Sequence, residues 1–400
     1  MNTTNTAFDP TDPAFLSNPY PTYRRLREES PIFFFEKWNA YVLTRYEDVN
    51  TLLRDRKLGR VLDNHPQWGE YEWQFEQTRV GSILEIEPPD HTRIKEVFHQ
   101  TFTPKRVREL SGKIHALCER LVDGLLERPA READLIHDFA QPIPVTVIAD
   151  LLGIPEADRH HLVPWSKGII GWFEPERTEA MEAEAIRCAQ EFAAYLRAMI
   201  PLKRQQPGDD LFSAMLQVHD REPERLSEQE LVNNCILLLN AGHEAVVNVM
   251  GNGMKALLSH PEAYARLEAD PSLIPTAVEE MMRYDTPLQF FERYVLEPLE
   301  YKGQRWERGT KLVLYYASAN HDPAVFRDPE TFDIARNPNP HLAFGAGLHY
   351  CIGAPLARVE LQTALQVLLE RLPELRLLPQ DFRYMPKNVF RYLEGLKVAY

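Results

Sequence analysis

Residues 344–358 read FGAGLHYCIGAPLAR, and a segment with helical periodicity follows them directly. Gly345 and Gly347 allow positive φ angles and a close approach of the backbone to a flat partner, and Gly353 removes a side chain where the new helix would lie against it. Cys351 would stand at a helix N-terminus, where unpaired N–H groups and the helix dipole favour a thiolate. The alternative is a buried structural cysteine beside a glycine turn, which the spacing of glycines and His349 disfavours.

The other three cysteines have ordinary surroundings. Cys118, Cys188 and Cys235 lie far apart in apolar segments with helical periodicity, and no C-x-x-C pair is present. Such residues are usually small core side chains, and their spacing fits a reducing compartment.

Charge and hydropathy exclude several classes of protein. The 400 residues include 45 basic and 59 acidic ones, a formal net charge of -14, which argues against nucleic acid as the main partner. The N-terminus lacks the pattern of a signal peptide, and no stretch approaches the roughly 20 apolar residues of a membrane span. We therefore expect a cytoplasmic protein without a membrane partner.

Periodicity predicts a mainly α protein with small sheets. Residues 32–44 are rich in aromatic and β-branched types around a polar break at 36–39, which indicates a hairpin. A second β region covers 293–316, with a turn within 302–309. Most of the remainder has helical periodicity, as in 111–127, 182–199 and 359–372.

Residues 227–259 predict one long helix. Ser227 and Glu230 form a capping-box pattern, and about 30 residues without proline would extend about 45 Å. The middle of this helix carries Ala241, Gly242, His243 and Glu244. Two interpretations stay open: close approach to a bulky group, or a helix crossing at the Ala241–Gly242 pair.

The order F-G-x-G-x-H-x-C-x-G before a helix resembles the cysteine-ligand signature of the cytochrome P450 family, and the resemblance extends from about Pro19 onward. It implies a mainly α fold: a single large P450-type domain over residues 1–400, with residues 1–18 as an extended segment. It also implies haem b (iron protoporphyrin IX), with Cys351 as the metal ligand and Phe344 and Gly353 beside the cofactor. The thiolate would push electron density to the iron and favour O–O cleavage.

Further residues match the family in chain order. The resemblance assigns contacts with the haem propionates to His91, Lys95, Arg293 and His349, although the family commonly has arginine where this chain has Lys95. It assigns a structural network to three residues, namely Glu280, Arg283 and Arg336.

The long helix departs from the family pattern. The family usually has threonine after Ala/Gly-Gly-x-Asp/Glu, whereas this chain reads Gly242-His243-Glu244-Ala245. The hydroxyl normally helps to deliver protons during oxygen activation. A substrate hydroxyl could replace it, Glu244, His243 or Asn248 could order water instead, or the reaction could be peroxide-driven oxygenation or oxidative coupling. We take residues 242–245 as the catalytic segment.

The resemblance implies a monooxygenase that inserts one oxygen atom from O2 into a small apolar or aromatic substrate. Candidate pocket residues are Trp172, Leu288, Phe290 and Phe390, with further aromatic residues at Trp68, Tyr71, Trp73 and Phe75, and each of these could instead pack in the core. Electrons would come from a ferredoxin and a ferredoxin reductase, with Arg93 and Arg358 as candidate basic contacts.

Two rival functions have different requirements. A haem-binding sensor would ligate iron through the same sulfur without turnover. A zinc enzyme could use His115 with Cys118, or His160 with His161, but these pairs lack further ligands at metal spacing.

Overall fold

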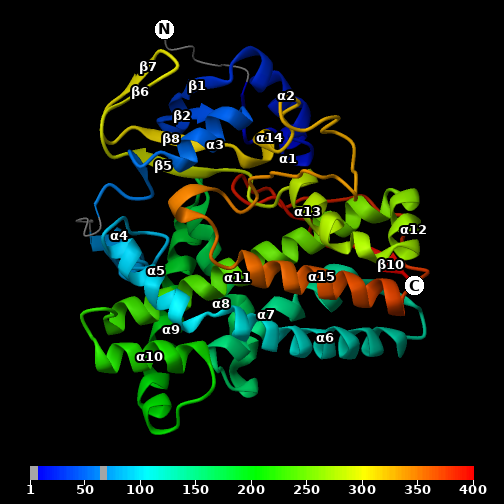
Figure 1. The fold of residues 1–400 in the computed structure, drawn as a ribbon, viewed down its shortest axis with the longest axis horizontal. Helices are drawn as coiled ribbons and strands as arrows, with labels where there is room; N and C mark the ends of the chain where they lie inside the picture. Colours follow the sequence, from blue (N-terminus) through cyan, green and yellow to red (C-terminus); the bar gives the residue numbers. More distant parts are fainter. Residues whose placement is uncertain (1–7, 64–69) are drawn as a thin grey trace. The chain divides into compact units, whose positions relative to one another are not determined.

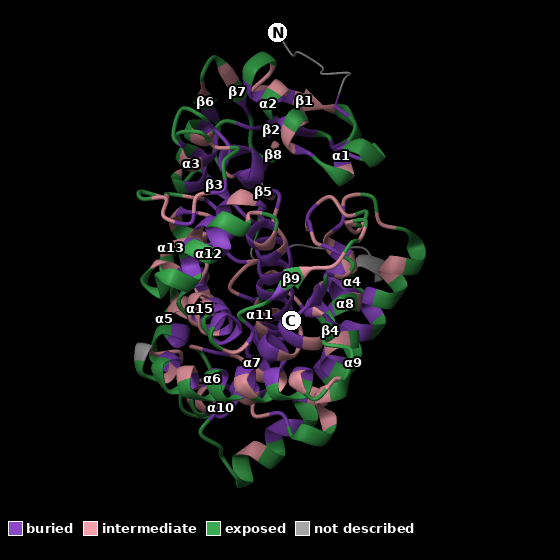
Figure 2. Ribbon diagram, turned by 90° about the vertical axis from the view of Figure 1, so that its right-hand side faces the viewer, coloured by how far each residue is buried: buried purple, intermediate pink, exposed green. Residues whose placement is uncertain are grey.

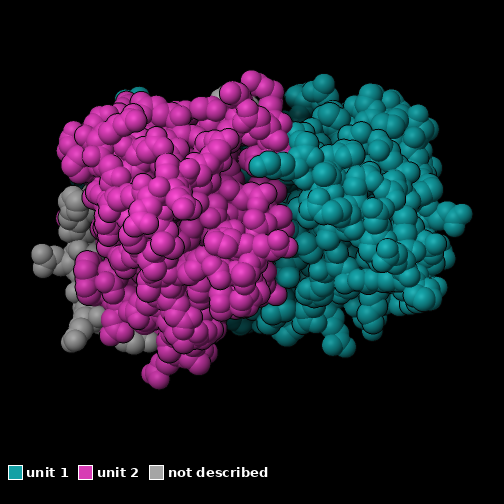
Figure 3. All heavy atoms as spheres, turned by 90° about the horizontal axis from the view of Figure 1, so that it is seen from below, with its two compact units in different colours: residues 1–59, 111–143, 245–400 teal, residues 60–110, 144–244 magenta. Residues whose placement is uncertain are grey.

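The structure, a computed structural model, describes residues 8–63 and 70–400, leaving out the side chains of residues 70–72 and 104 (Figure 1). Trp68 and the side chain of Tyr71 therefore lie outside the described part. The chain divides into two compact units, each built from separate segments (Figure 3). Unit 1 comprises residues 1–59, 111–143 and 245–400, and unit 2 comprises residues 60–110 and 144–244.

The main sheet of unit 1 has five strands in the order β1-β2-β8-β5-β3. β2 and β8 are parallel and the other pairs are antiparallel. The predicted hairpin is confirmed, because its two strands pair across a 3-10 turn that ends with Asn39 at φ 46°. The strand bounds are β1 Ile32–Phe35, β2 Ala40–Leu43, β3 Leu58–Gly59, β5 Phe291–Val295 and β8 Lys311–Leu314.

The second predicted β region also forms, with one difference. β6 (Leu299–Tyr301) and β7 (Gln304–Trp306) make a tight hairpin through Lys302 and Gly303, both at positive φ. The predicted turn at 302–309 therefore contains a strand. A third sheet has three short strands in the order β4-β10-β9, and it joins the end of the chain to an earlier segment. Its strands are β4 Glu132–Asp134, β10 Lys397–Ala399 and β9 Arg376–Leu377.

Helices make up most of both units. Those wholly within unit 1 are α1 Pro13–Ser17, α2 Tyr20–Glu29, α3 Tyr46–Arg54, α12 Pro261–Ala269, α13 Ile274–Tyr284, α14 Tyr316–Ala319 and α15 Ala354–Arg371. Those wholly within unit 2 are α4 Glu70–Glu76, α5 Asp90–Thr101, α8 Leu162–Ile170, α9 Glu179–Gln205 and α10 Leu211–Arg221. The chain passes between the units inside α6 (Pro104–Leu126), α7 (Pro142–Leu152) and α11 (Glu228–Leu258).

The N-terminal segment is not wholly extended. Helix α1 begins after Asp12, whose side chain accepts a hydrogen bond from the Ala14 N–H group. The expectation of an extended segment over residues 1–18 is therefore wrong for Pro13–Ser17, because a capping aspartate and a proline at the first turn start a helix there.

The long helix forms as α11, and most of it is buried (Figure 2). The capping box is present: the Ser227 N–H group donates to Glu230 Oε2 at 2.8 Å, and the Glu230 N–H group donates to Ser227 Oγ at 3.2 Å. A Cβ atom added to Gly242 would lie 2.5 Å from Ile148 Cδ1 of α7. The glycine thus lets the Ile148 side chain of α7 pack closely on α11, which agrees with a helix crossing, the second of the two interpretations of the central segment.

Among the helices of residues 8–63 and 70–400, none is long and apolar enough to cross a membrane.

Candidate functional site

The cysteine loop in unit 1 has the backbone that its glycines predict. Gly345 and Gly347 have φ angles of 67° and 72°. The Cys351 N–H group donates to the Phe344 carbonyl at 3.1 Å, which closes the loop, and α15 begins three residues after Cys351. A Cβ atom on Gly347 would lie 2.2 Å from the Leu53 carbonyl oxygen of α3. Gly347 therefore allows the C-terminal end of α3 to pack against the cysteine loop, whereas we expected this glycine to face a flat partner.

Cys351 lies at the start of α15, as expected, but burial opposes its ionisation. Desolvation by the surrounding protein raises the pKa of the Cys351 thiol. The N–H groups of Gly353 and Ala354 and the charge of Arg358 lower this pKa, with a smaller effect. The N–H groups at the start of α15 therefore act in the expected direction, but desolvation has the larger effect, and a bound cation would favour the deprotonated sulfur further.

Glu280, Arg283 and Arg336 meet in a buried network in unit 1. The Arg283 guanidinium donates two hydrogen bonds of 2.8 Å to the Glu280 carboxylate, and Arg336 Nε donates to the same carboxylate at 3.1 Å. Glu280 and Arg283 are fully buried. Arg283 also donates to the Asn320 and Pro329 carbonyls, so the network ties α13 to the segment that leads to the cysteine loop.

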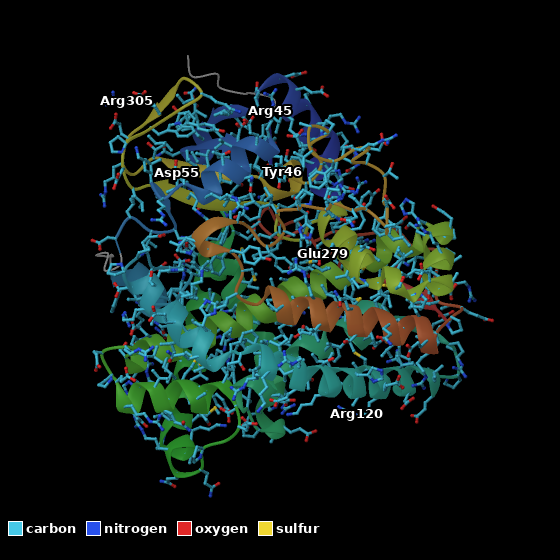
Figure 4. The ribbon with its side chains drawn as sticks, in the orientation of Figure 1. Arg45, Tyr46, Asp55, Arg120, Glu279 and Arg305 are labelled. Atoms are coloured by element: carbon cyan, nitrogen blue, oxygen red, sulfur yellow. The ribbon has the colours of Figure 1, made fainter. Side chains whose placement is uncertain are left out.

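A second carboxylate beside it was missed at the sequence level. Glu279, labelled in Figure 4, accepts hydrogen bonds from Arg358 Nε at 2.6 Å and from His341 Nε2 at 3.0 Å. These partners outweigh desolvation and lower the pKa of Glu279 to about 2. The Arg358 guanidinium also covers the Phe344 ring at 4.6 Å. The sequence did offer a signal for Glu279, because it is next to Glu280. Consecutive residues on a helix point in different directions, so each glutamate would need a partner of its own.

The four proposed propionate contacts are divided between the units. Arg293 on β5 and His349 in the cysteine loop belong to unit 1, and Arg293 is buried and donates to the Glu292 carbonyl. His91 and Lys95 belong to unit 2, one turn apart on α5, and His91 is buried. Each pair therefore lies within one unit. The buried residue of each pair stands on a strand or a helix, Arg293 on β5 and His91 on α5.

His243 and Glu244 are buried in the middle of α11. His243 Nδ1 lies 3.2 Å from Ser166 Oγ and 3.6 Å from Glu244 Oε1. Burial, with the charge of Lys167, lowers the pKa of His243 to about 4, and burial raises the pKa of Glu244. At neutral pH His243 is therefore uncharged. Ala245, the next residue of the helix, is partly exposed.

The family model for cytochrome P450 matches residues 33–382. The chain belongs to the cytochrome P450 family. It is 37% identical to the cytochrome P450 monooxygenase PikC of Streptomyces venezuelae, over 96% of this chain and 92% of that protein. It matches the crystal structure of P450BioI in complex with hexadec-9Z-enoic acid ligated acyl carrier protein (TM-score 0.90, 34% identity, 97% of this chain and 99% of that one). CYP109E1 from Bacillus megaterium in complex with testosterone is also similar (TM-score 0.88, 30% identity, 96% of this chain and 98% of that one).

Membership confirms the expected fold, class of enzyme and cofactor. Cytochromes P450 are haem b monooxygenases, so the protein is an oxidoreductase. The residues present fit a haem: Cys351 offers a sulfur at a helix N-terminus, and Gly353 leaves the space beside it clear, since an added Cβ would lie 3.8 Å from Sγ. On the long helix of this P450, three residues spaced four apart are not fully buried: Leu237, Ala241 and Ala245. This spacing places them on one face of the helix.

The four candidate pocket residues of this P450 differ in their surroundings. Phe290 is 1% exposed, and its ring packs against Trp38 and Tyr315 at 5.2 and 4.9 Å in the core beside the main sheet. The residue just before β5 thus packs in the core of unit 1, and its assignment to the pocket stays a prediction. Leu288 and Phe390 form a β-bridge and stay partly exposed. Trp172, in unit 2, is buried and stacks on the Phe75 ring at 4.1 Å.

The lowered pKa of His243 predicts acid sensitivity of this P450. Above pH 6.5 the imidazole is neutral in both the folded and unfolded states, so its contribution to stability is complete. As the pH falls from 6.5 towards 4 the unfolded state binds the proton first, and we expect a loss of about 3 kcal/mol. Urea unfolding at pH 7 and 4.5 should show a smaller acid loss in His243→Gln than in wild type. Exposed His99→Gln is the control, and an equal loss in all three proteins would contradict the assignment.

Proposed function

We propose that this P450 inserts one oxygen atom from O2 into a small, largely apolar or aromatic substrate, with electrons from a separate ferredoxin and ferredoxin reductase. The observation that carries the proposal is the cysteine loop, in which Cys351 faces N–H groups at the start of α15. The bound haem would supply oxygen activation, and the thiolate would donate electron density to its iron.

Individual residues would take separate roles around the cofactor. Cys351 would bind the iron, while Arg293, His349, His91 and Lys95 would bind the propionates as cationic or N–H donors. Phe344 and Gly353 would lie against the porphyrin. The network of Glu280 with its two arginines would hold the loop in position without contacting the reacting atoms.

The substrate class is supported by side chains and by relatives. Phe75, Ile169 and Phe173 lie in the wall of a small hollow in unit 2, and Trp172 stacks on Phe75. The same wall also carries six polar residues, namely Thr78, Arg79, Ser82, Glu85, Asn233 and Asn240. Leu288 and Phe390 add apolar surface in unit 1. Two similar proteins were solved with a long-chain acyl group on a carrier protein and with testosterone, both largely apolar molecules.

The proposal is tested with purified protein and a reconstituted electron-transfer system. Haem uptake, a thiolate-type spectrum of the ferrous carbonyl complex, and Soret shifts with small apolar compounds are the expected results. Product formed with NADPH, reductase and ferredoxin would separate a monooxygenase from a haem-binding sensor. A protein that binds haem and shifts its spectrum with ligand, yet forms no product with any donor or with peroxide, would favour the sensor.

Ala245 has no hydroxyl group, so another group would have to deliver protons during oxygen activation. Glu244 is the residue that we favour for this role. Its carboxyl is buried with a raised pKa, so it can keep a proton at a pH where an exposed glutamate cannot. A peroxide-driven or coupling reaction is the alternative. The first would show as product formed with hydrogen peroxide and without ferredoxin, and the second as a product that contains no added oxygen atom.

Ala245→Thr is expected to change the fraction of electrons recovered in product, because the new hydroxyl would order water in the proton path. The measurement is the ratio of product formed to NADPH consumed, together with hydrogen peroxide released. Ala245→Val is the control, since it has a similar shape without the hydroxyl. Equal ratios in wild type and the threonine variant would show that this position is outside the proton path.

A further inference from the structure

The small hollow in unit 2 that Phe75, Ile169 and Phe173 help to line has a second, polar part of its wall. The hollow is lined by residues of α4, α8 and α11 and of the loop that follows α4 (Figure 1). Its volume is about 30 Å³, which is room for one or two water-sized groups. A group that enters it must therefore be small, such as one end of a longer molecule.

Asn233, in the polar part of the wall, has all its hydrogen-bonding partners within the protein. Its Nδ2 donates to the Gln77 and Val80 carbonyls at 2.9 and 2.8 Å. Its Oδ1 accepts a hydrogen bond from Gln229 Nε2 at 2.8 Å. Both ends of this amide are therefore occupied before any ligand binds.

Arg79, the cation in the wall, is also paired. Its guanidinium donates to Glu76 Oε1 at 2.7 Å and to Glu85 Oε1 at 2.5 Å, and it lies over the Phe173 ring at 5.1 Å. Two carboxylates neutralise one cation, so this part of the wall offers little attraction to a ligand that carries a carboxylate.

Asn240 on α11 differs from these neighbours in the wall. It is 8% exposed, and its Nδ2 donates to the Ile236 carbonyl, one turn earlier, at 3.0 Å. Its Oδ1 is buried and accepts no hydrogen bond from any residue that the structure describes. Reversing the amide would set Oδ1 against the Ile236 carbonyl oxygen, so the Nδ2 bond fixes which atom stays unpaired. A buried acceptor is normally bonded, and this one lacks only a donor.

We propose that Asn240 Oδ1 accepts a hydrogen bond from an O–H or N–H group of the substrate, and that it thereby selects apolar or aromatic molecules carrying such a donor. This inference rests on the proposed function, because it takes the hollow as part of the substrate pocket. The apolar side chains would contact the body of the substrate, and the amide would bind the donor at its end. An ether brings no proton to Oδ1, and an ionised carboxylate would place a second acceptor against it.

The test is a set of Soret titrations of the purified haem protein with matched molecules. The pairs are 1-decanol with decyl methyl ether, and 4-phenylphenol with 4-methoxybiphenyl, and decanoate is the anionic comparison. We expect the wild type to bind the hydroxyl compound of a pair about tenfold more tightly than its ether, and more tightly than decanoate. In Asn240→Leu the affinity for the hydroxyl compound should fall about tenfold, while that for the ether stays at the wild-type value.

Leu237→Ala provides the matched control, because Leu237 belongs to the same wall and the same helix. It removes apolar contact, so it should weaken binding of the hydroxyl compound and its ether by the same factor. Thermal unfolding of the ligand-free proteins gives a second readout. Asn240→Leu should unfold at the wild-type temperature or above it, since it removes an unpaired buried acceptor.

Three results would overturn the proposal. They are wild-type protein that binds each ether as tightly as its hydroxyl partner, wild-type protein that binds neither hydroxyl compound, and Asn240→Leu protein that loses affinity for both members of a pair equally. A clear fall in the unfolding temperature of ligand-free Asn240→Leu would likewise show that the amide serves the fold instead. Haem uptake and a thiolate-type ferrous carbonyl spectrum in the same preparations would leave the haem-thiolate assignment standing in each case.

Discussion

Replacing Cys351 by alanine is expected to remove the thiolate signature of the ferrous carbonyl complex and to abolish product formation. No other described cysteine can substitute, because Cys118, Cys188 and Cys235 are buried in the interiors of α6, α9 and α11, whereas Cys351 lies just before the start of a helix. Carbonyl difference spectra and single-turnover assays measure the two effects.

Cys235→Ala on α11 is the matched control for this experiment. It removes a fully buried sulfur of similar size, so it should lower stability modestly while the spectrum keeps its thiolate form. An unchanged spectrum in Cys351→Ala would show that another group binds the iron, and the proposed function would then lose its basis.

Glu280→Gln is expected to lower the free energy of unfolding by about 3–5 kcal/mol, because it leaves two guanidinium groups, one fully and one largely buried, without their shared counter-charge. The amide keeps the shape of the carboxylate and isolates the effect of charge. Urea denaturation of the haem-free protein measures the change. The fraction of protein that retains haem should also fall, since Arg283 and Arg336 hold the segment before the cysteine loop.

Glu307→Gln provides the comparison for that variant. Glu307 pairs with Arg305, both side chains are more than half exposed, and solvent screening should keep the loss below about 1 kcal/mol. Similar losses in the two variants would contradict a structural role for the buried network.

Local patterns were sufficient wherever the deciding contact is close in sequence. The hairpin at 32–44 follows from aromatic and β-branched residues around a polar break, and the start of α11 follows from a serine and a glutamate three residues apart. The cysteine motif could be read in the same way, because its glycines, histidine and cysteine lie within ten residues of one another.

Contacts between distant segments decided the rest. Gly347 faces the end of α3 and Gly242 faces α7, although the same glycines in isolation suggest a ligand. Phe290 turns into the core, and Arg358 is held by a glutamate on another helix. An aromatic or charged residue has the same local pattern in a core, a pocket or an ion pair, so only its tertiary neighbours determine which of these it joins.

The sequence alone therefore determined the family, the residue that offers sulfur to iron, and the order of the main elements. Tertiary structure determined which groups raise and lower the pKa of that sulfur and which residues lie in the core. The physical reason is that burial and pairing depend on which distant side chains meet, and these set desolvation and charge at each site.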